Sequence, residues 1–214
     1  MSHTLLQGII VKAFGGFYFV QVGTKIYTCS LRGRLKRSEE GVLVGDRVLM
    51  QDLGNAEGVV EELLPRQNQL LRPKAANIEQ ALLVIAVRDP SPDWILLDRL
   101  LVLVGHAGIA PVICFNKEDL LTDAAKLPLE IYKKALREIL QDKISILAGP
   151  SGVGKTSILN MVQEGLALAT GEISNKLGRG KHTTRHVQLL PLDFGGWVAD
   201  SPGFSRLDLP QELM

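Results

Sequence analysis

The first third of the chain carries five short segments that are apolar or alternate between apolar and polar residues. They are separated by turn residues, notably Gly15-Gly16 and Gly54-Asn55, and cover residues 8–13, 17–22, 26–31, 45–51 and 58–64. Five short strands joined by turns are typical of a small β-barrel of the OB type. We therefore predict such a barrel for residues 1–68, with an SH3-like barrel or another small sheet as the alternative.

The pattern changes near residue 77, where continuous apolar runs begin to alternate with helical segments. A polar stretch from Pro65 to Asn77 precedes this change, and we predict a linker at residues 69–76. Apolar runs suited to buried parallel strands lie at residues 81–87, 109–115 and 144–149.

Helices are predicted between these strands. Ser91-Pro92 offers a cap and a first-turn proline for a helix from Trp94 to Val104, and a second helix is expected near residues 128–141. Alternating strands and helices indicate a parallel sheet. We therefore predict an α/β domain over residues 77–214.

Composition narrows the class of protein only a little. The chain has 214 residues, 46% of them apolar, and a formal net charge of +1 at pH 7. This balance favours packed cores and restricts any nucleic-acid contact to local patches. Cys29 and Cys114 lack the paired spacing of a zinc site or disulfide framework, and neither a secretory signal nor a membrane-spanning stretch is evident. We expect a soluble protein of the reducing cytoplasm.

A glycine-rich motif supplies the first candidate chemistry. Residues 149–156 read GPSGVGKT, which matches G-x-x-x-x-G-K-[ST], follows a predicted strand and opens a predicted helix. In such loops backbone N–H groups surround phosphate oxygens, while Lys155 would reach the β- and γ-phosphates and Thr156 would bind Mg²⁺. The loop alone equally suits an ATPase or a nucleoside-monophosphate kinase. The predicted phosphate-binding residues are Gly149, Pro150, Ser151, Gly152, Val153, Gly154, Lys155, Thr156 and Ser157.

A second motif selects the base. Residues 116–119 read NKED after a predicted strand and match the N-K-x-D element of GTPases. Asp119 would accept hydrogen bonds from guanine N1–H and the 2-amino group, whereas adenine would leave the carboxylate desolvated and unpaired. Asn116 would hold the loop near the base, and the aliphatic part of Lys117 would pack over the ring. The motif therefore favours GTP over ATP.

A third motif completes the set. Residues 200–203 read DSPG at the end of a short predicted strand, residues 197–200, and fit the D-x-x-G element of a switch loop. Asp200 would hold Mg²⁺ through a water, and the Gly203 N–H would contact the γ-phosphate. We therefore predict a GTPase in which the base motif precedes the phosphate loop, whereas in the usual order it comes last.

This permuted order behind a β-barrel resembles the family of GTPases that depend on the small ribosomal subunit. Members are bacterial ribosome-assembly enzymes with an OB domain, a circularly permuted GTPase domain and a C-terminal zinc domain. The resemblance runs along essentially the whole chain. Its motifs are GDRV (45–48), ANIEQALLV (76–84), DRLL (98–101), NKED, GPSGVGKT, GRGKHTTRH (178–186) and ADSPGF (199–204).

The resemblance implies roles for the segment between the phosphate loop and the switch. Phe204 occupies the place where Ras-like enzymes carry a water-orienting glutamine. The family's corresponding histidine makes His182 the candidate catalytic residue, with His186 as its nearest rival. Either Thr183 or Thr184 would reach Mg²⁺ and the γ-phosphate in the GTP state.

The same resemblance implies partners. The protein would bind the small (30S) ribosomal subunit and its 16S rRNA during late assembly. The subunit would stimulate GTP hydrolysis, and hydrolysis would time release of the protein. Basic clusters at residues 31–37 and 176–186 are candidate RNA contacts. The default oligomeric state is a monomer, and no membrane contact is expected. An RNA-binding module with a structural nucleotide and a phosphotransferase are the competing functions.

Two departures from the family pattern lead to further expectations. In the family, a helix, a strand with an S-A-x loop and another helix lie between the base motif and the phosphate loop, and they require about 30 residues. The interval between Asp119 and Ile144 is shorter than that. No S-A-x motif is present, so we predict missing residues between about Tyr132 and Arg137. The family's Zn²⁺ ligands are likewise absent from this sequence, so the only metal expected in this chain is Mg²⁺.

Overall fold

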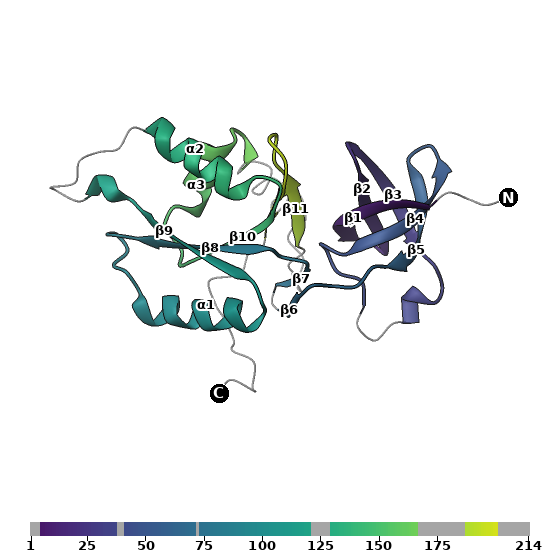
Figure 1. Cartoon of the computed structure of the whole chain (residues 1–214), viewed down its shortest axis with the longest axis horizontal. Coiled ribbons are helices and arrows are strands. Elements are labelled where there is room, and N and C mark those ends of the chain that lie inside the picture. The colour runs from purple at the N-terminus through teal and green to yellow at the C-terminus, as the bar shows by residue number, and fades with distance from the viewer. Residues whose placement is uncertain (1–4, 38–40, 72, 121–128, 167–186, 201–214) are drawn as a thin grey trace. The chain divides into compact units, whose positions relative to one another are not determined.

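The computed structural model describes residues 5–37, 41–71, 73–120, 129–166 and 187–200 (Figure 1). The chain divides into two compact units. The first comprises Met1–Ile78 with His186–Leu189, and the second comprises Glu79–Arg185 with Leu190–Met214. The domain limits expected at residues 69–76 stay a prediction.

The first unit contains a closed five-stranded barrel. Its strands are β1 (Leu5–Phe14), β2 (Phe17–Val22), β3 (Lys25–Leu31), β4 (Arg47–Gly54) and β5 (Glu57–Leu63), with a short 3-10 turn at Leu35–Arg37. The strand order β2-β3-β5-β4-β1 is closed by pairing of β1 with β2, and only the β3–β5 pair is parallel. The prediction of an OB-type barrel is confirmed.

Two glycines allow the barrel strands to approach closely. A Cβ on Gly8 would lie 2.7 Å from the carbonyl oxygen of Gln21, and a Cβ on Gly58 would lie 2.8 Å from that of Gln51. Any larger side chain at either position would push neighbouring strands apart, since both obstacles are backbone atoms. The barrel core is built from fully buried apolar side chains, including those of Ile10, Val20, Cys29, Met50 and Val60.

The segment expected to be a linker is folded. Strands β6 (Gln69–Leu71) and β7 (Lys74–Ala76) form a two-stranded antiparallel sheet. The Asn77 carboxamide donates to the Gly45 carbonyl at 2.9 Å and accepts from the Gln67 N–H at 2.8 Å. Polar residues here satisfy buried backbone groups, which is why a polar composition did not produce an open linker.

A buried ion pair ties this segment to the barrel. The Asp46 side chain is fully buried, and Arg66 donates to it from Nε at 2.7 Å and from Nη2 at 2.9 Å. Arg66 Nη2 also donates to the Gly41 carbonyl, and the Leu43 N–H donates to Asp46. Buried charges persist only when they are paired and hydrogen-bonded in this way.

We expect Arg66→Met to destabilise the first unit by about 3–5 kcal/mol, because it leaves the Asp46 carboxylate buried without its cation. The measurement is urea unfolding followed through amide hydrogen exchange of the barrel strands. Arg32→Met is the matched control, since Arg32 pairs with Glu61 at 2.6 Å but is 59% exposed, and exposed pairs contribute about 0–1 kcal/mol. Equal losses from both substitutions would contradict the expected role of the buried pair.

The second unit is a parallel sheet between helices. Strands β8 (Gln80–Ala86), β9 (Ala110–Asn116), β10 (Ile144–Ala148) and β12 (Trp197–Asp200) lie in the order β12-β10-β8-β9, all parallel. Helix α1 (Trp94–His106) covers one face, while α2 (Leu129–Leu140) and α3 (Lys155–Val162) cover the other (Figure 1). The predicted α/β sheet is confirmed. Strand β11 (Gln188–Pro191), beside β12, was not predicted.

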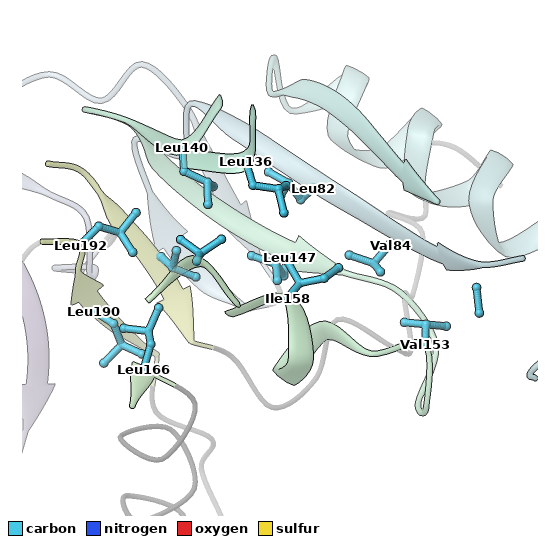
Figure 2. Packing of buried hydrophobic residues seen from close by; sticks show 13 residues of the cluster. Leu82, Val84, Leu136, Leu140, Leu147, Val153, Ile158, Leu166, Leu190 and Leu192 are labelled. Carbon is cyan, nitrogen blue, oxygen red and sulfur yellow. The ribbon is translucent and has the colours of Figure 1, made fainter. Parts of the chain in front are cut away.

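One apolar cluster holds α2 and α3 against the sheet (Figure 2). Leu82 and Val84 of β8 and Leu147 of β10 meet Leu140 of α2 and Ile158 of α3, all with less than a tenth of their surface exposed. Every residue of β8 is buried, as expected for a central parallel strand. Among the described residues, no helix has the length and apolar character needed to span a membrane.

One local prediction in this unit is wrong. The N-cap of α1 is Asp93, whose side chain accepts from the Leu96 N–H at 2.9 Å, and not Ser91-Pro92. Helix α2 is continuous through residues 132–137, and the expectation that residues are missing near this stretch stays a prediction. Leu136 and Leu140 are one helical turn apart and face the core. Arg137 donates to the Val162 carbonyl at 3.1 Å and so joins α2 to the end of α3.

Candidate functional site

The carboxyl ends of the parallel strands define where a ligand is expected. The chain passes from β8 to β9 on one side and then returns to β10 on the other side of β8. Open α/β sheets bind ligands beyond the strand ends at such a reversal of strand order. Three loops leave this edge: one after β8, the NKED segment after β9 and the glycine-rich loop after β10.

The glycine-rich loop runs from β10 directly into α3. Gly149, Gly152 and Gly154 have φ values of +147°, +80° and +94°, which side chains other than glycine rarely adopt. A Cβ on Gly149 would overlap the Val84 carbonyl oxygen of β8. Val153 is buried, Pro150 is half-buried, and Ser151, Thr156 and Ser157 are exposed. The loop thus packs tightly on the sheet while its hydroxyl groups face outward.

The start of α3 fits an anionic ligand. Gly154 is the N-cap and supplies no side-chain acceptor, so the first N–H groups of the helix have no capping partner from it. The Lys155 ammonium donates to the carbonyls of Gly149 and Pro150, each at 2.7 Å. Burial lowers the pKa of Lys155, and a bound phosphate would oppose that shift by stabilising the charged form.

The NKED segment is joined to the glycine-rich loop by its first residue. The Asn116 carboxamide, at the end of β9, donates from Nδ2 to the Val153 carbonyl at 2.8 Å. Lys117 has a φ of +64°, and its ammonium donates to the Asp89 carbonyl in the loop after β8. Asp119 is exposed within the 3-10 turn Glu118–Leu120. These bonds hold all three loops together and leave the Asp119 carboxylate accessible.

Asp200 ends β12, the strand beside β10. The parallel register pairs Ile146 with Ala199, so Asp200 follows at the same edge of the sheet as the glycine-rich loop. Its side chain and the residues Gly203, His182, Thr183, Thr184 and His186 lie outside what the structure describes. Among the described residues, no cluster of three or more His, Cys, Asp or Glu side chains is arranged to hold a metal ion.

The link between the loops leads to a test at Gly154. We expect Gly154→Ala to weaken GTP binding about tenfold more than Gly152→Ala, because only the first displaces the Asn116 carboxamide and its hydrogen bond. A Cβ on Gly154 would overlap Asn116 Nδ2, whereas a Cβ on Gly152 meets nothing closer than Pro90 Cδ at 3.9 Å. Both glycines have positive φ, so the comparison isolates the contact. Equal losses in a calorimetric titration would count against it.

Sequence reasoning missed the part played by the loop after β8. Lys117 binds it through the Asp89 carbonyl, and Asn116 binds the glycine-rich loop through the Val153 carbonyl. Backbone acceptors leave no signal in residue identity. The side chains of NKED could be predicted from the sequence, but their partners could not.

The parallel sheet, the glycine-rich loop and the base motif placed ahead of it define a circularly permuted P-loop GTPase. A family model described as RsgA GTPase matches residues 63–210, and one described as RsgA N-terminal domain matches residues 7–60. The chain belongs to the RsgA GTPase family and is a GTPase.

Relatives and solved structures agree with this assignment. The small ribosomal subunit biogenesis GTPases RsgA of Carboxydothermus hydrogenoformans and Moorella thermoacetica are 46% and 47% identical, over 96% of this chain and 77% of each relative. YjeQ from Thermotoga maritima matches with a TM-score of 0.81 and 32% identity, over 96% of this chain and 77% of that structure. YloQ, a circularly permuted GTPase, matches with a TM-score of 0.71 and 33% identity, over 96% and 74%.

The alignments bear on the short interval before β10. They extend over 224 and 223 residues, more than the 214 residues of this chain. The two relatives therefore carry residues within the matched region that this chain lacks. That these residues belong between Asp119 and Ile144 stays a prediction.

Proposed function

We propose that this GTPase acts in the cytoplasm during late assembly of the small ribosomal subunit, binding the subunit and its 16S rRNA. The similarity to relatives named small ribosomal subunit biogenesis GTPase carries the proposal. In this account the subunit stimulates GTP hydrolysis, and hydrolysis times release of the protein.

The phosphates of GTP would lie on residues 149–157. Backbone N–H groups at the start of α3 would bind the phosphate oxygens, and Lys155 would exchange its two carbonyl acceptors for the β- and γ-phosphates. The Asn116–Val153 bond supports this placement, since it fixes the base loop against the phosphate loop. Asp119 would then accept from guanine N1–H and the 2-amino group.

Magnesium fits the donors expected at this site. Thr156 is exposed at the start of α3, and Asp200 ends the neighbouring strand. We propose that Thr156, Asp200 through a water, and Thr183 or Thr184 hold Mg²⁺, an ion that prefers oxygen ligands. When bound, it would neutralise charge on the phosphate oxygens. Gly203 would contact the γ-phosphate.

Hydrolysis requires a group that positions water. Water attacks the γ-phosphorus, the bond to the β–γ bridging oxygen breaks, and GDP and phosphate leave. Phe204 cannot orient water by hydrogen bonding, so we assign that role to His182 from the family resemblance. Because no arginine finger is evident in the sequence, intrinsic hydrolysis should be slow.

The barrel offers one candidate RNA contact at residues 31–37. Arg32 and Arg34 are both exposed there, and each is positioned by Glu61: Arg32 through the carboxylate at 2.6 Å, Arg34 through the backbone carbonyl at 2.7 Å. Lys36 is exposed on the same segment. A fixed set of cations on an OB barrel suits the phosphate backbone of RNA.

The test is phosphate release from GTP with and without purified small subunits. Partner-assisted GTPases gain roughly 10³–10⁵ in rate, and we expect small subunits to raise the rate of phosphate release at least about tenfold. Large subunits at the same concentration are the control and should leave the rate unchanged. No stimulation by small subunits, or equal stimulation by both, would contradict the ribosomal role while leaving GTP binding intact.

A further inference from the structure

The hairpin between β1 and β2 carries two phenylalanines at its tip. Phe14 and Phe17 pair directly across the hairpin, and the turn between them is Gly15-Gly16, with φ values of +61° and +82°. Two positive φ values in a two-residue loop are those of the type I′ turn, which fits the twist of a hairpin. A Cβ at either glycine would meet no atom of the described residues within 4 Å, so the space around the turn is open.

Both rings lie on the outer surface of the barrel. Tyr18 pairs with Cys29 of β3, which is fully buried in the barrel core, so Tyr18 faces inward and its neighbour Phe17 faces outward. Phe14 lies on the same face as its partner Phe17. Phe14 is 47% exposed and Phe17 is 53% exposed. Large apolar side chains that adjoin each other and remain exposed are a feature of binding surfaces.

The basic cluster at residues 31–37 lies at the same end of the barrel as this aromatic pair. Strands β2 and β3 are antiparallel neighbours (Figure 1), so the residues that follow Cys29 run past the start of β2, where Phe17 lies. Arg32 comes directly after the end of β3, and its N–H donates to the Val60 carbonyl of β5 at 3.0 Å. The first cation of the cluster is therefore held at the end of the barrel that carries the two rings.

Exposed rings beside fixed cations match the chemistry of a single-stranded nucleic acid. Unpaired bases stack on aromatic side chains, while the phosphates of the strand pair with cations. Arg32, Arg34 and Lys36 are exposed in the basic cluster, so charge favours an anionic strand over an uncharged apolar partner. The loop between the first two strands is one of the places where OB barrels bind oligonucleotides. A duplex would use the cations alone, because its bases are already stacked on each other.

We propose that Phe14 and Phe17 stack on unpaired bases of a single-stranded RNA segment whose phosphates lie on the basic cluster. This inference rests on the proposed ribosomal role and narrows it, because it names unpaired nucleotides as the part of the rRNA that the barrel binds. The basic cluster alone would bind the backbone of any RNA. The aromatic pair adds a preference for segments whose bases are free to stack.

Fluorescence anisotropy of the whole chain with a labelled oligouridine of about ten nucleotides tests the proposal, a length within the site size of one OB barrel. Phe17→Ala should weaken binding of this strand about tenfold, because one base stack is lost. It should leave the affinity for an abasic strand of the same length within about twofold, since that strand carries the phosphates without the bases. Ile26→Ala is the matched control: Ile26 is similarly exposed (50%) near the other end of β3 and should change neither affinity.

The salt dependence of binding separates the rings from the cations. Arg34→Ala should weaken binding of both strands and reduce the slope of log affinity against log salt by about 0.7, since one phosphate contact is lost. Phe17→Ala should leave that slope unchanged, because stacking releases no counterions. A slope that falls equally in both variants would contradict separate roles for the two groups.

Three results would overturn the stacking proposal: no binding of oligouridine by the wild-type protein, no loss from Phe17→Ala, or equal losses on the oligouridine and the abasic strand. The ribosomal role is tested separately, by phosphate release with small subunits. Stimulation by small subunits without oligouridine binding would remove the stacking proposal alone. Oligouridine binding that depends on Phe17, without stimulation by small subunits, would remove the ribosomal role alone.

Discussion

Replacing Asp119 by asparagine is expected to lower GTP affinity by about 100- to 1,000-fold, since two hydrogen bonds to an ionised acceptor are lost or reversed. The Asn amide can still accept from guanine N1–H, but its NH₂ group faces the 2-amino group of the base. Two donors then oppose each other. Asp119 is exposed in the turn that follows Asn116 and Lys117, so the substitution leaves the fold unchanged.

Xanthosine triphosphate provides the complementary half of this test. Xanthine carries a carbonyl oxygen where guanine has its 2-amino group, so the asparagine NH₂ can donate to it. The variant should bind XTP more tightly than GTP, and the wild-type protein should show the reverse order. Glu118→Gln, in the same turn, is the control and should keep the preference for GTP. Calorimetric titrations in which Asp119→Asn keeps normal GTP affinity would contradict the assignment of the base-reading residue.

Removing the imidazole of His182 is expected to slow GTP hydrolysis by about 10²–10⁴-fold, the usual contribution of a positioned acid–base group. Affinity for GTP should stay within about twofold of wild type, because the proposed role acts on the attacking water and not on ground-state binding. The measurement is single-turnover phosphate release with His182→Ala, in the presence and absence of small subunits.

Two other histidines make this prediction specific. His186→Ala tests the rival candidate in the same segment and should retain most of the activity. His106→Ala is the control, since His106 is exposed in the last turn of α1. Wild-type rates for His182→Ala, or an equal loss for His186→Ala, would remove the assignment.

The order of strands and helices could be predicted from the sequence, because the spacing of apolar residues indicates the type of each element and turn residues indicate where it ends. The runs at residues 17–22 and 26–31 became β2 and β3, and the buried run at 81–87 became β8. Burial on both faces makes β8 continuously apolar, a pattern that is hard to mistake when glycine or polar turns flank it. Strand β11 escaped notice because its four residues end in Pro191 and offer no alternation.

Sequence reasoning missed contacts that polar side chains make with backbone groups and with each other. The polar composition of residues 69–76 indicated a linker, yet Asn77 and the Arg66–Asp46 pair bind this segment to the barrel. The predicted cap of α1 was Ser91, but the observed cap is Asp93, because its carboxylate accepts from the Leu96 N–H in the first turn of the helix. The Asn77 and Arg66 partners lie far apart in the sequence, so they depend on three-dimensional proximity and cannot be inferred from spacing along the chain, whereas the Asp93 cap is three residues from its partner.

The candidate site divides in the same way. Residue types such as Lys155 and Asp119 could be assigned from their motifs, because phosphate and guanine chemistry demand them. The two hydrogen bonds that join the three loops run from Asn116 to the Val153 carbonyl and from Lys117 to the Asp89 carbonyl. Any residue could supply these backbone acceptors. The position of Asn116 against Gly154 explains why a glycine is needed there for more than its φ angle.

The most direct test of a guanine-nucleotide site built from these three loops is equilibrium binding of GTP and ATP to the wild-type protein with Mg²⁺. A carboxylate that the bound base removes from water and leaves unpaired costs about 1–3 kcal/mol or more, so we expect GTP to bind at least about 100-fold more tightly than ATP. Lys155→Ala should lose both nucleotides. Equal affinity for GTP and ATP, or GTP binding that survives Lys155→Ala, would contradict the account.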